Sequence, residues 1–188
     1  MSPADLHARI AAVTERIAAH QGGRPLDAAL GDFLNAEFGP ASAAWRELKA
    51  VCEAGVAAGW LCQREGGGIR YGRVFKPAPE LHGFSVDVVD MAAPRWAAPS
   101  KQPPPRGADG GLPPAGGAED HIAGPHHVHP EGEIDLVMPI AGDARFDGAG
   151  AGWLVCPPGS AHWPTVSGGR ALVLYLLPNG RIDFTREA

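Results

Sequence analysis

Side chains that commonly bind transition metals gather within eight positions of the sequence, in the stretch HHVHPEGE. They are His126, His127, His129 and Glu133. Successive side chains of a strand point to opposite faces, so His127 and His129 share one face and His126 points away from it. A turn at Pro130 allows Glu133 to return to the face of the two histidines. This stretch therefore predicts half of a metal-binding site.

A further candidate ligand follows one hairpin later, in the segment PPGSAH from Pro157 to His162. Its proline and glycine predict a turn that ends one strand and brings His162 toward the first group. Three neutral imidazoles and a carboxylate suit divalent iron, manganese, nickel, copper or zinc, and the residue types alone do not choose among these metals. The histidines could instead form hydrogen bonds inside a β-rich core, but four candidate ligands in two motifs favour one divalent transition metal per chain.

The two motifs together resemble those of the cupin superfamily. The first is a histidine, one residue, a histidine, three residues and a glutamate, and the second is Pro-x-Gly-x-x-His. This resemblance implies a small double-stranded β-barrel, or jelly roll, that holds a metal on histidines and a glutamate. By position, the implied metal ligands are His127, His129, Glu133 and His162. Eight residues separate Glu133 from Gly142, which is a longer interval than the usual cupin pattern has.

Longer segments on both sides of these motifs resemble a narrower family, the 4-hydroxylaminobenzoate lyases of nitroaromatic degradation. The segments are GWLCQREGGGIRYGRVFKP, HGFSVDVVDM, HPEGEIDLVMP and GWLVCPPGSAHWPTVSGGRALVLYLLP. The resemblance implies a lyase that converts 4-hydroxylaminobenzoate, or a related aryl hydroxylamine, to 3,4-dihydroxybenzoate and ammonia. This reaction is redox-neutral, and the chain lacks a GxGxxG pattern, so no nucleotide cofactor is expected. Two alternatives remain: a cupin-type Fe(II) dioxygenase or isomerase acting on an aromatic substrate, and a non-catalytic cupin that binds a small molecule.

Breaking the N–O bond of a hydroxylamine requires a proton or a Lewis acid at the departing oxygen. If Glu133 acts in catalysis as a metal ligand, proton transfer falls to another side chain. The candidates for proton transfer are His82, His126 and Asp135. Asp135 shares the strand face of Glu133 and could also orient a ligand histidine.

Basic residues near the first motif could hold the substrate carboxylate, because a guanidinium or an ammonium pairs well with a carboxylate. Arg70, Arg73 and Lys76 lie on one predicted strand, within the family-like sequence around GRVFKP. Trp163 and Tyr175 could flank an aromatic ring, although most aromatic side chains of a small barrel belong to its core. These five are the predicted substrate-binding residues.

The first 59 residues read as helices. Ser2 and Pro3 are typical of a helix start, apolar residues follow at helical spacing to about His20, and two further apolar stripes precede Gly59. We predict a helical cap over residues 1–59. Helices before a hairpin also resemble a DNA-binding winged helix, but the third helix has no excess of positive charge. The cap is therefore expected to pack on the barrel or at a subunit contact.

The pattern of residues 60–188 predicts short strands with frequent glycine and proline turns. Such strands are typical of a β-barrel or sandwich. The predicted strands cover residues 60–62, 69–76, 84–91, 124–129, 133–140, 144–146, 152–156, 162–166, 170–177 and 182–184. Residues 92–119 are rich in proline, glycine and alanine and predict a flexible insertion, in which Trp96 could plug a pocket. The predicted fold is mainly β, with an N-terminal helical part.

Charge and composition limit the expected partners. The net charge of −5 includes no basic block, so neither nucleic acid nor an anionic membrane surface is an expected partner. The longest apolar stretch, residues 171–177, is too short to span a bilayer, and the three cysteines form no CxxC pattern. We expect a cytoplasmic protein that binds a small aromatic substrate as a homodimer or higher homo-oligomer.

Overall fold

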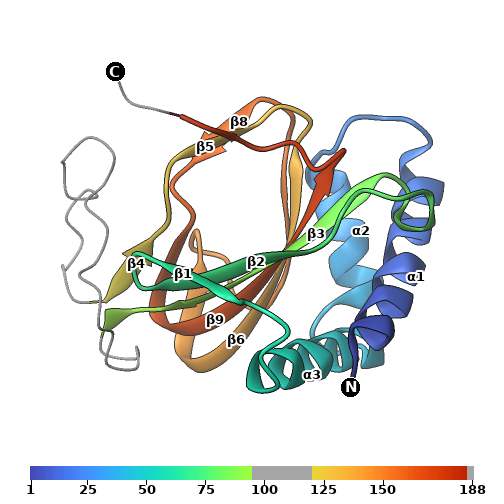
Figure 1. Cartoon of the computed structure of the whole chain (residues 1–188). Helices are drawn as coiled ribbons and strands as arrows, with labels where there is room; N and C mark the ends of the chain where they lie inside the picture. Colours follow the sequence, from blue (N-terminus) through green and yellow to red (C-terminus); the bar gives the residue numbers. More distant parts are fainter. Residues whose placement is uncertain (95–119, 186–188) are drawn as a thin grey trace.

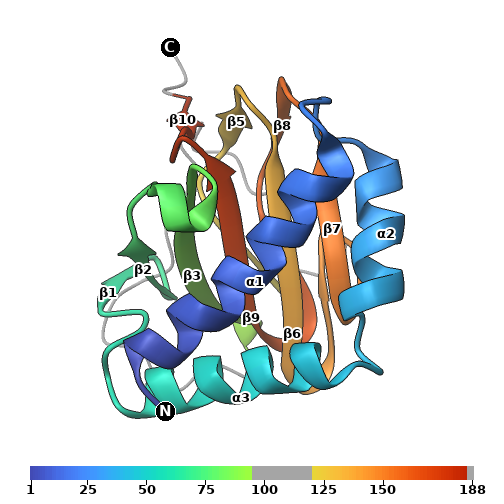
Figure 2. The ribbon, with the colours of Figure 1, turned by 90° about the vertical axis from the view of Figure 1, so that its right-hand side faces the viewer.

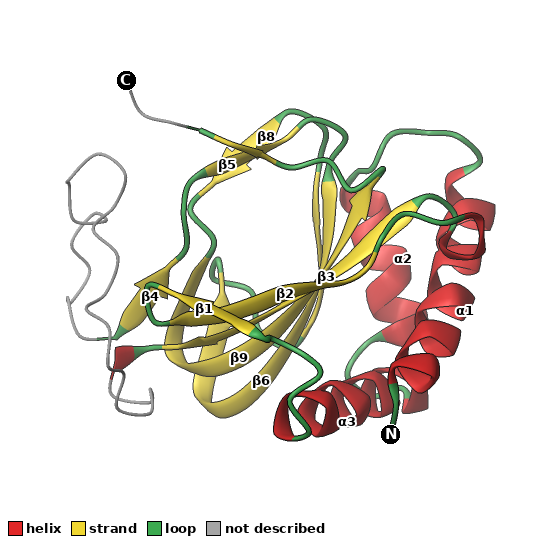
Figure 3. Cartoon of the chain, viewed as in Figure 1, coloured by secondary structure: helices red, strands yellow, loops and turns green. Residues whose placement is uncertain are grey.

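The computed structural model describes residues 1–94 and 120–185 of the chain (Figure 1). Three helices come first: α1 (Pro3–Gln21), α2 (Ala28–Phe38) and α3 (Ala43–Ala57). Strands follow, with one short 3-10 helix, η1 (Pro79–Leu81), among them. The prediction of a mainly β fold with an N-terminal helical part is confirmed (Figure 3). Most of the predicted insertion, residues 95–119 with Trp96, lies outside the described residues.

Side-chain caps fix where the helices begin, and at α2 the Asp27 carboxylate accepts a hydrogen bond from the Leu30 amide. The Ser2 hydroxyl accepts a hydrogen bond from the Asp5 amide, the Asp5 carboxylate accepts one from the Ser2 amide, and Pro3 occupies the first turn. The Ser42 hydroxyl caps α3 by accepting a hydrogen bond from the Trp45 amide. Among the described residues, no helix is long and apolar enough to cross a membrane.

The strands form two antiparallel sheets. The large sheet has the order β1 (Arg64–Gly66), β2 (Ile69–Phe75), β3 (Phe84–Ala92), β9 (Thr165–Pro178), β6 (Glu133–Phe146) and β7 (Gly152–Cys156), and β4 (His121–Ala123) also pairs with β9. The small sheet has the order β10 (Asp183–Phe184), β5 (His127–His129) and β8 (Ser160–His162). In Figure 1 the small sheet lies above the large one, and the helices lie to one side. This double-sheet arrangement agrees with the predicted cupin-like fold.

The large sheet has two faces with different partners, because side chains alternate along each strand. In Figure 2 the helices cover one face of the large sheet. The side chains of that face and of the helices form a single hydrophobic cluster. From β6 and β9 this cluster takes the even-numbered residues Ile134, Leu136, Met138, Leu172, Leu174 and Leu176. The odd-numbered residues Val137, Val173 and Tyr175 belong to a second cluster on the opposite face. We call these the helix face and the inner face, and Glu133 and Asp135 share the parity of the inner face.

Asn35 of α2 fixes the helical layer to β7, an edge strand of the large sheet. Its side-chain amide donates to the Trp153 carbonyl, and its side-chain oxygen accepts from the Trp153 amide, both at 2.8 Å. The Trp153 indole N–H donates to the Phe38 carbonyl at 2.9 Å, and the ring is buried on the helix face. Trp153 is therefore a packing residue and does not face the small sheet.

The pairings of the described strands do not close the two sheets into one barrel. The connections into and out of β5 and β8 all contain proline, at Pro125, at Pro130, at Pro157 and Pro158, and at Pro164. Proline has no amide hydrogen to continue a ladder, so pairing stops at these points. The small sheet consequently stays separate, with strands of two or three residues.

Several strand boundaries differ from those predicted. Residues 60–62 form no strand, because the amides of Trp60 and Leu61 both bond to the Gly55 carbonyl and close the end of α3. The strands predicted at 133–140 and 144–146 are one strand, β6, whose pairing with β9 shifts register between Pro139 and Ala141 and again before residue 145. Such bulges allow a proline inside a strand.

Candidate metal centre

Four side chains from the two sheets converge between them. His127 and His129 come from β5, His162 ends β8, and Glu133 begins β6. Each offers a ligand atom within 4.8 Å of those of the others. His162 Nε2 lies 3.1 Å from His127 Nε2 and 3.8 Å from Glu133 Oε1, and His129 Nδ1 lies 3.2 Å from Glu133 Oε2. The structure thus brings together the four residues predicted as metal ligands.

Strand pairing and one tight turn produce this convergence. His127 and His162 are directly opposite each other in the antiparallel pair of β5 and β8, so their side chains share a face. The chain then turns at Gly132, which has a φ of 86°. A Cβ at this position would lie 2.8 Å from the Cys156 carbonyl oxygen, so only glycine fits the turn that returns Glu133 to the site.

Burial shifts the pKa values of three of these side chains, His127, His129 and Glu133. His129 and Glu133 are fully buried, whereas the His162 side chain is 19% exposed. Burial lowers the pKa of His127 to about 4 and the pKa of His129 to about 3, so both are neutral, as a metal requires, at neutral pH. Burial, and next the neighbouring Asp135, raises the pKa of Glu133 well above 4.5. A divalent cation at Glu133 would oppose this rise by favouring the carboxylate.

The hydrogen-bond partners of two histidines determine which ring nitrogens carry lone pairs. His127 Nδ1 lies 3.0 Å from the Pro125 carbonyl oxygen, which can only accept, so this nitrogen carries the proton. His162 Nδ1 contacts the Asp147 carboxylate and carries its proton for the same reason. The two Nε2 atoms therefore face each other at 3.1 Å with lone pairs on both.

Other polar atoms at the same point also lack partners. Both ring nitrogens of His129 and both carboxyl oxygens of Glu133 are buried without a hydrogen bond to any described residue. The short distance between His129 and Glu133 does not have the geometry of a hydrogen bond. Unpaired buried polar atoms are costly, and one cation among them would satisfy these atoms and the facing Nε2 atoms together. The residues present fit a transition metal.

Asp147 is a functional candidate that the sequence analysis missed. Its carboxylate contacts His162 Nδ1 and accepts a hydrogen bond from the Thr165 amide at 2.8 Å. The residue lies in the turn between β6 and β7, followed by Gly148. An aspartate before a glycine is typical of any tight turn, so the sequence contains no signal that connects Asp147 with His162.

A second group of protonatable side chains adjoins Glu133 on the inner face. Asp135 and Cys156 offer atoms within 4.8 Å of the Glu133 carboxyl, and the Cys156 sulfur lies 4.0 Å from Asp135 Oδ2. Burial raises the pKa of Asp135 well above 3.8, and burial also raises the pKa values of Cys156 and Tyr175. Burial therefore favours the protonated form of each of these groups beside the four converging ligands.

A row of polar residues crosses the inner face from this group. Arg73 of β2 is opposite Asp87 of β3, Asp87 is opposite Tyr175 of β9, and Tyr175 is opposite Asp135 of β6. Directly opposite residues in antiparallel strands point to the same side, so all four lie on one face. Arg73 Nε donates to Asp87 Oδ1 at 2.9 Å, and Arg73 Nη2 donates to the Gly180 carbonyl at 3.2 Å.

Comparison with known proteins assigns the chain to a family. Residues 8–184 match the family model described as PnbB, 4-hydroxylaminobenzoate lyase. The chain belongs to the 4-hydroxylaminobenzoate lyase family. A protein of that name from Pseudomonas putida is 30% identical over 162 residues, which cover 83% of this chain and 82% of the relative. Another, from Nocardioides sp. (strain LMS-CY), is 31% identical over 161 residues, which cover 82% of this chain and 80% of the relative.

Two solved structures resemble this lyase-family chain over part of its length. One is a protein of unknown function with a cupin-like fold from Ralstonia eutropha JMP134, with 18% identity, coverage of 59% of this chain and 55% of the other, and a TM-score of 0.32. The other is oxalate oxidase in complex with the substrate analogue glycolate, with 16% identity, coverage of 64% and 57%, and a TM-score of 0.36. The family assignment depends on the lyase relatives and not on these partial likenesses.

The cations predicted to bind substrate lie in different places in this member of the lyase family. Arg73 is on the inner face with Tyr175, as described above. Arg70 points to the helix face, where it pairs with Asp90 at 3.6 Å. Lys76 is exposed in the loop after β2. The structure therefore brings Arg73, and not Arg70, to the side of the sheet that carries the converging ligands.

Two predicted proton-transfer residues and one predicted aromatic contact lie away from the four ligands. His126 is on the other side of β5, where Nδ1 lies 2.7 Å from Thr185 Oγ1 and the ring is 4.2 Å from that of Trp163. Trp163 is 43% exposed. His82 follows η1, and its Nδ1 lies 3.3 Å from Thr14 Oγ1 of α1. Asp135 is the predicted proton-transfer residue that lies beside Glu133.

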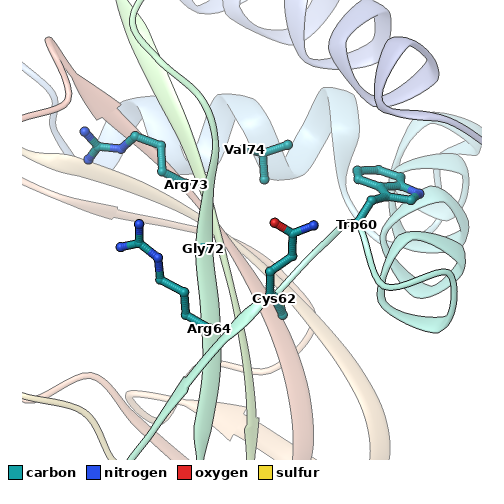
Figure 4. A pocket seen from close by; sticks show the side chains of 7 residues that line it. Trp60, Cys62, Arg64, Gly72, Arg73 and Val74 are labelled. Carbon is teal, nitrogen blue, oxygen red and sulfur yellow. The ribbon is translucent and has the colours of Figure 1, made fainter.

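A shallow cavity of about 160 Å³ lies where α3 leads into β1 and β2 (Figure 4). Its lining residues are Trp60, Cys62, Gln63, Arg64, Gly72, Arg73 and Val74. None of the four converging ligands lines it, so this cavity is separate from the candidate metal centre. Arg64 is opposite Tyr71 across β1 and β2, which places a second guanidinium on the side of the sheet that carries Arg73.

Proposed function

We propose that this chain is a metal-dependent lyase that converts 4-hydroxylaminobenzoate and water to 3,4-dihydroxybenzoate and ammonia. Membership of the lyase family supports the substrate and the reaction. The observation that carries the metal dependence is the pair of Nε2 atoms of His127 and His162, which face each other with lone pairs beside the buried Glu133. Iron, manganese, zinc and nickel all suit such a set of ligands.

The proposed reaction involves no net oxidation. The N–O bond breaks with both electrons going to oxygen, which leaves as water while another water adds its oxygen to the neighbouring ring carbon. A further water then replaces the nitrogen, which leaves as ammonia, so the net change is the uptake of one water. A divalent metal bound by the four residues would supply a Lewis acid for the departing oxygen.

Asp135 is the residue we propose for proton transfer. It is fully buried on the inner face, next to Glu133, and its burial raises the pKa of the carboxyl well above 3.8, which favours the protonated form. Its Oδ1 has no hydrogen-bond partner among the described residues, so this oxygen can present the proton to a bound molecule. Glu133 has the role of a ligand in this proposal, and His82 and His126 take no part in it.

Arg73 is the residue we propose for the substrate carboxylate. It lies on the inner face, and its side chain is 37% exposed, so a ligand can reach it. Hydrogen bonds to both carboxylate oxygens of Asp87 and to the Gly180 carbonyl hold its guanidinium in place. Three strand spacings of about 4.8 Å separate the backbones of Arg73 and Asp135, roughly 14 Å in all, so the aromatic acid would lie across the inner face.

The test is incubation of the purified protein with 4-hydroxylaminobenzoate without oxygen, while ammonia and 3,4-dihydroxybenzoate are measured. The wild type is expected to form both products in equal amounts. Glu133→Gln is expected to lose kcat through loss of metal, whereas Arg73→Ala is expected to raise KM mainly. Arg70→Ala is the matched comparison, because Arg70 is on the same strand but faces the helices, and its KM is expected to stay near that of the wild type.

Two results would contradict the proposal and favour its alternatives. Product that forms only when oxygen and Fe(II) are supplied would identify a dioxygenase. Binding of the aromatic acid with no turnover in either condition would identify a non-catalytic binding protein. Equal effects of Arg73→Ala and Arg70→Ala on KM would overturn the carboxylate site alone.

A further inference from the structure

We propose that Asp147 is a positioning residue that fixes the tautomer of His162, so that Nε2 of this histidine is free to bind the metal. The proposal rests on the metal centre described under the proposed function. It concerns a residue in the turn between β6 and β7, far in the chain from the ligand it would control. Among the four converging side chains, His162 is the most exposed. Packing therefore restrains its ring least, and its orientation depends most on a hydrogen bond to a residue outside the four ligands.

Two contacts of the carboxylate and one of the backbone hold Asp147 against His162. Its Oδ2 contacts His162 Nδ1, and its Oδ1 accepts a hydrogen bond from the Thr165 amide at 2.8 Å. The Asp147 amide donates to the Thr165 carbonyl at 2.9 Å, which ties the turn to the start of β9. The residue has a φ of 48°, in the left-handed region that aspartate and asparagine adopt more readily than most residues. Both carboxylate oxygens of Asp147 are therefore fixed, one by His162 and the other by the backbone of Thr165.

A carboxylate can only accept a hydrogen bond, so it places the imidazole proton on His162 Nδ1. The lone pair is then on Nε2, which lies 3.1 Å from His127 Nε2 and 3.8 Å from Glu133 Oε1. The Pro125 carbonyl has the same effect on His127. A carboxylate is the stronger acceptor of the two, and such partners of metal-binding histidines fix the ring orientation and raise the basicity of the ligand nitrogen.

Substitution of Asp147 with asparagine distinguishes control of the His162 tautomer from a general structural role. In Asp147→Asn, the side-chain oxygen can still accept from the Thr165 amide, and the backbone conformation remains accessible. The side-chain NH₂ then faces His162 Nδ1 and can only donate, which moves the imidazole proton to Nε2. In Asp147→Ala, water replaces the carboxylate, and His162 can adopt either tautomer. Asparagine is therefore expected to impair metal binding more than alanine, although it preserves more of the turn.

The first measurement is the histidine side-chain tautomer, from ¹H–¹⁵N correlation spectra of the metal-free protein at a pH above the ordinary imidazole pKa. The His162 signals are identified by their absence from a His162→Gln spectrum. The wild type is expected to carry the proton on Nδ1, and Asp147→Asn to carry it on Nε2. A wild-type His162 with its proton on Nε2, or an unchanged tautomer in Asp147→Asn, would overturn the proposal.

The second measurement is the affinity for Zn²⁺ or Mn²⁺, by competition with a chelator. Asp147→Asn is expected to bind about 10- to 100-fold more weakly than the wild type, and Asp147→Ala is expected to lose less. Asp143→Asn is the control, because Asp143 lies four residues earlier, near the end of β6, and its side chain is 86% exposed, and it is expected to match the wild type. A larger loss in alanine than in asparagine would show a structural role only. Because the tautomer is measured without metal, a chain that binds no metal would overturn the proposed function but not the tautomer result.

Discussion

Replacing Glu133 with glutamine is expected to change stability in opposite directions with and without metal. Burial, and next the neighbouring Asp135, raises the pKa of the Glu133 carboxyl well above 4.5. A carboxyl with a higher pKa in the folded state makes the folded protein less stable, relative to the unfolded one, as pH rises from the unfolded value toward the folded one. At neutral pH the metal-free wild type therefore bears a penalty at Glu133 that a neutral glutamine removes.

The size of this effect follows from the buried position of the carboxyl. Each unit of pKa difference corresponds to about 1.4 kcal/mol. The desolvation penalty of a buried polar group without partners is about 1–3 kcal/mol, so removing the ionisable carboxyl is expected to add about that much to the free energy of unfolding. For a chain of this length, 1 kcal/mol shifts Tm by about 2–4 °C. Metal has the opposite effect. At a concentration a thousand times Kd it adds about 4 kcal/mol to the free energy of unfolding of the wild type. The glutamine variant lacks the anionic ligand and gains much less.

Thermal unfolding of both proteins, with a chelator and with excess Zn²⁺ or Mn²⁺, provides the measurement. In chelator, Glu133→Gln is expected to melt above the wild type, by a margin that grows from pH 5 to pH 8. With excess metal, the wild type is expected to melt above Glu133→Gln. Glu131→Gln is the matched control. Among the described residues, Glu131 bonds only with Asn179 and Arg181, at the surface, and its response to metal is expected to equal that of the wild type.

Two results would refute this reasoning. A glutamine variant that melts below the wild type in chelator at pH 8 would show that the buried Glu133 carboxyl stabilises the metal-free fold. An equal rise in Tm with metal for both proteins would show that Glu133 is not a ligand. Either result would leave the strand pairing and the family membership unchanged.

Further predictions concern the metal ligands and the contacts that Asn35 and Gly152 make between α2 and β7. Combining His127→Ala with His162→Ala is expected to reduce the metal content from about one ion per chain to nearly none by elemental analysis, and an unchanged content would refute the metal assignment. Asn35→Ala removes two hydrogen bonds to the backbone of β7 and is expected to lower the free energy of unfolding in urea by about 2–3 kcal/mol. A loss below about 0.5 kcal/mol would show that these hydrogen bonds do not hold α2 on β7. Gly152→Ala, at a φ of 134° and with its Cβ 2.5 Å from Asn35 Oδ1, is expected to cost about 2 kcal/mol or more, whereas Gly150→Ala meets open space and serves as its control.

Local rules predict much of this fold from the sequence. The caps at Ser2 and Ser42 require only a hydroxyl at the right place before an apolar stripe, and both are observed. The alternation of strand side chains predicts that His127 and His129 share a face, and they do converge with Glu133. These features depend on residues a few positions apart, so the sequence is sufficient to predict them.

Features that depend on pairing between distant strands could not be predicted in the same way. Alternation separates Arg70 from Arg73, but only the order of β2, β3 and β9 shows which of them faces the inner side. Asp147 and His162 meet because a turn folds back on β9, and no spacing in the sequence predicts that contact. The continuity of β6 through Pro139 depends on bulges, which the residue types do not specify.

The two register shifts in β6 have a consequence for how this chain can change in length. Both lie beyond Met138, on the half of the strand away from Glu133 and Asp135, and they take up extra residues as bulges. An insertion or deletion between residues 139 and 145 can resize a bulge without turning the ligand-bearing half of the strand over. The long interval between Glu133 and Gly142 is therefore compatible with an undisturbed site. The ladder between residues 134 and 138 keeps its own register, so the bulges separate changes of length in this segment from the half of the strand that carries Glu133.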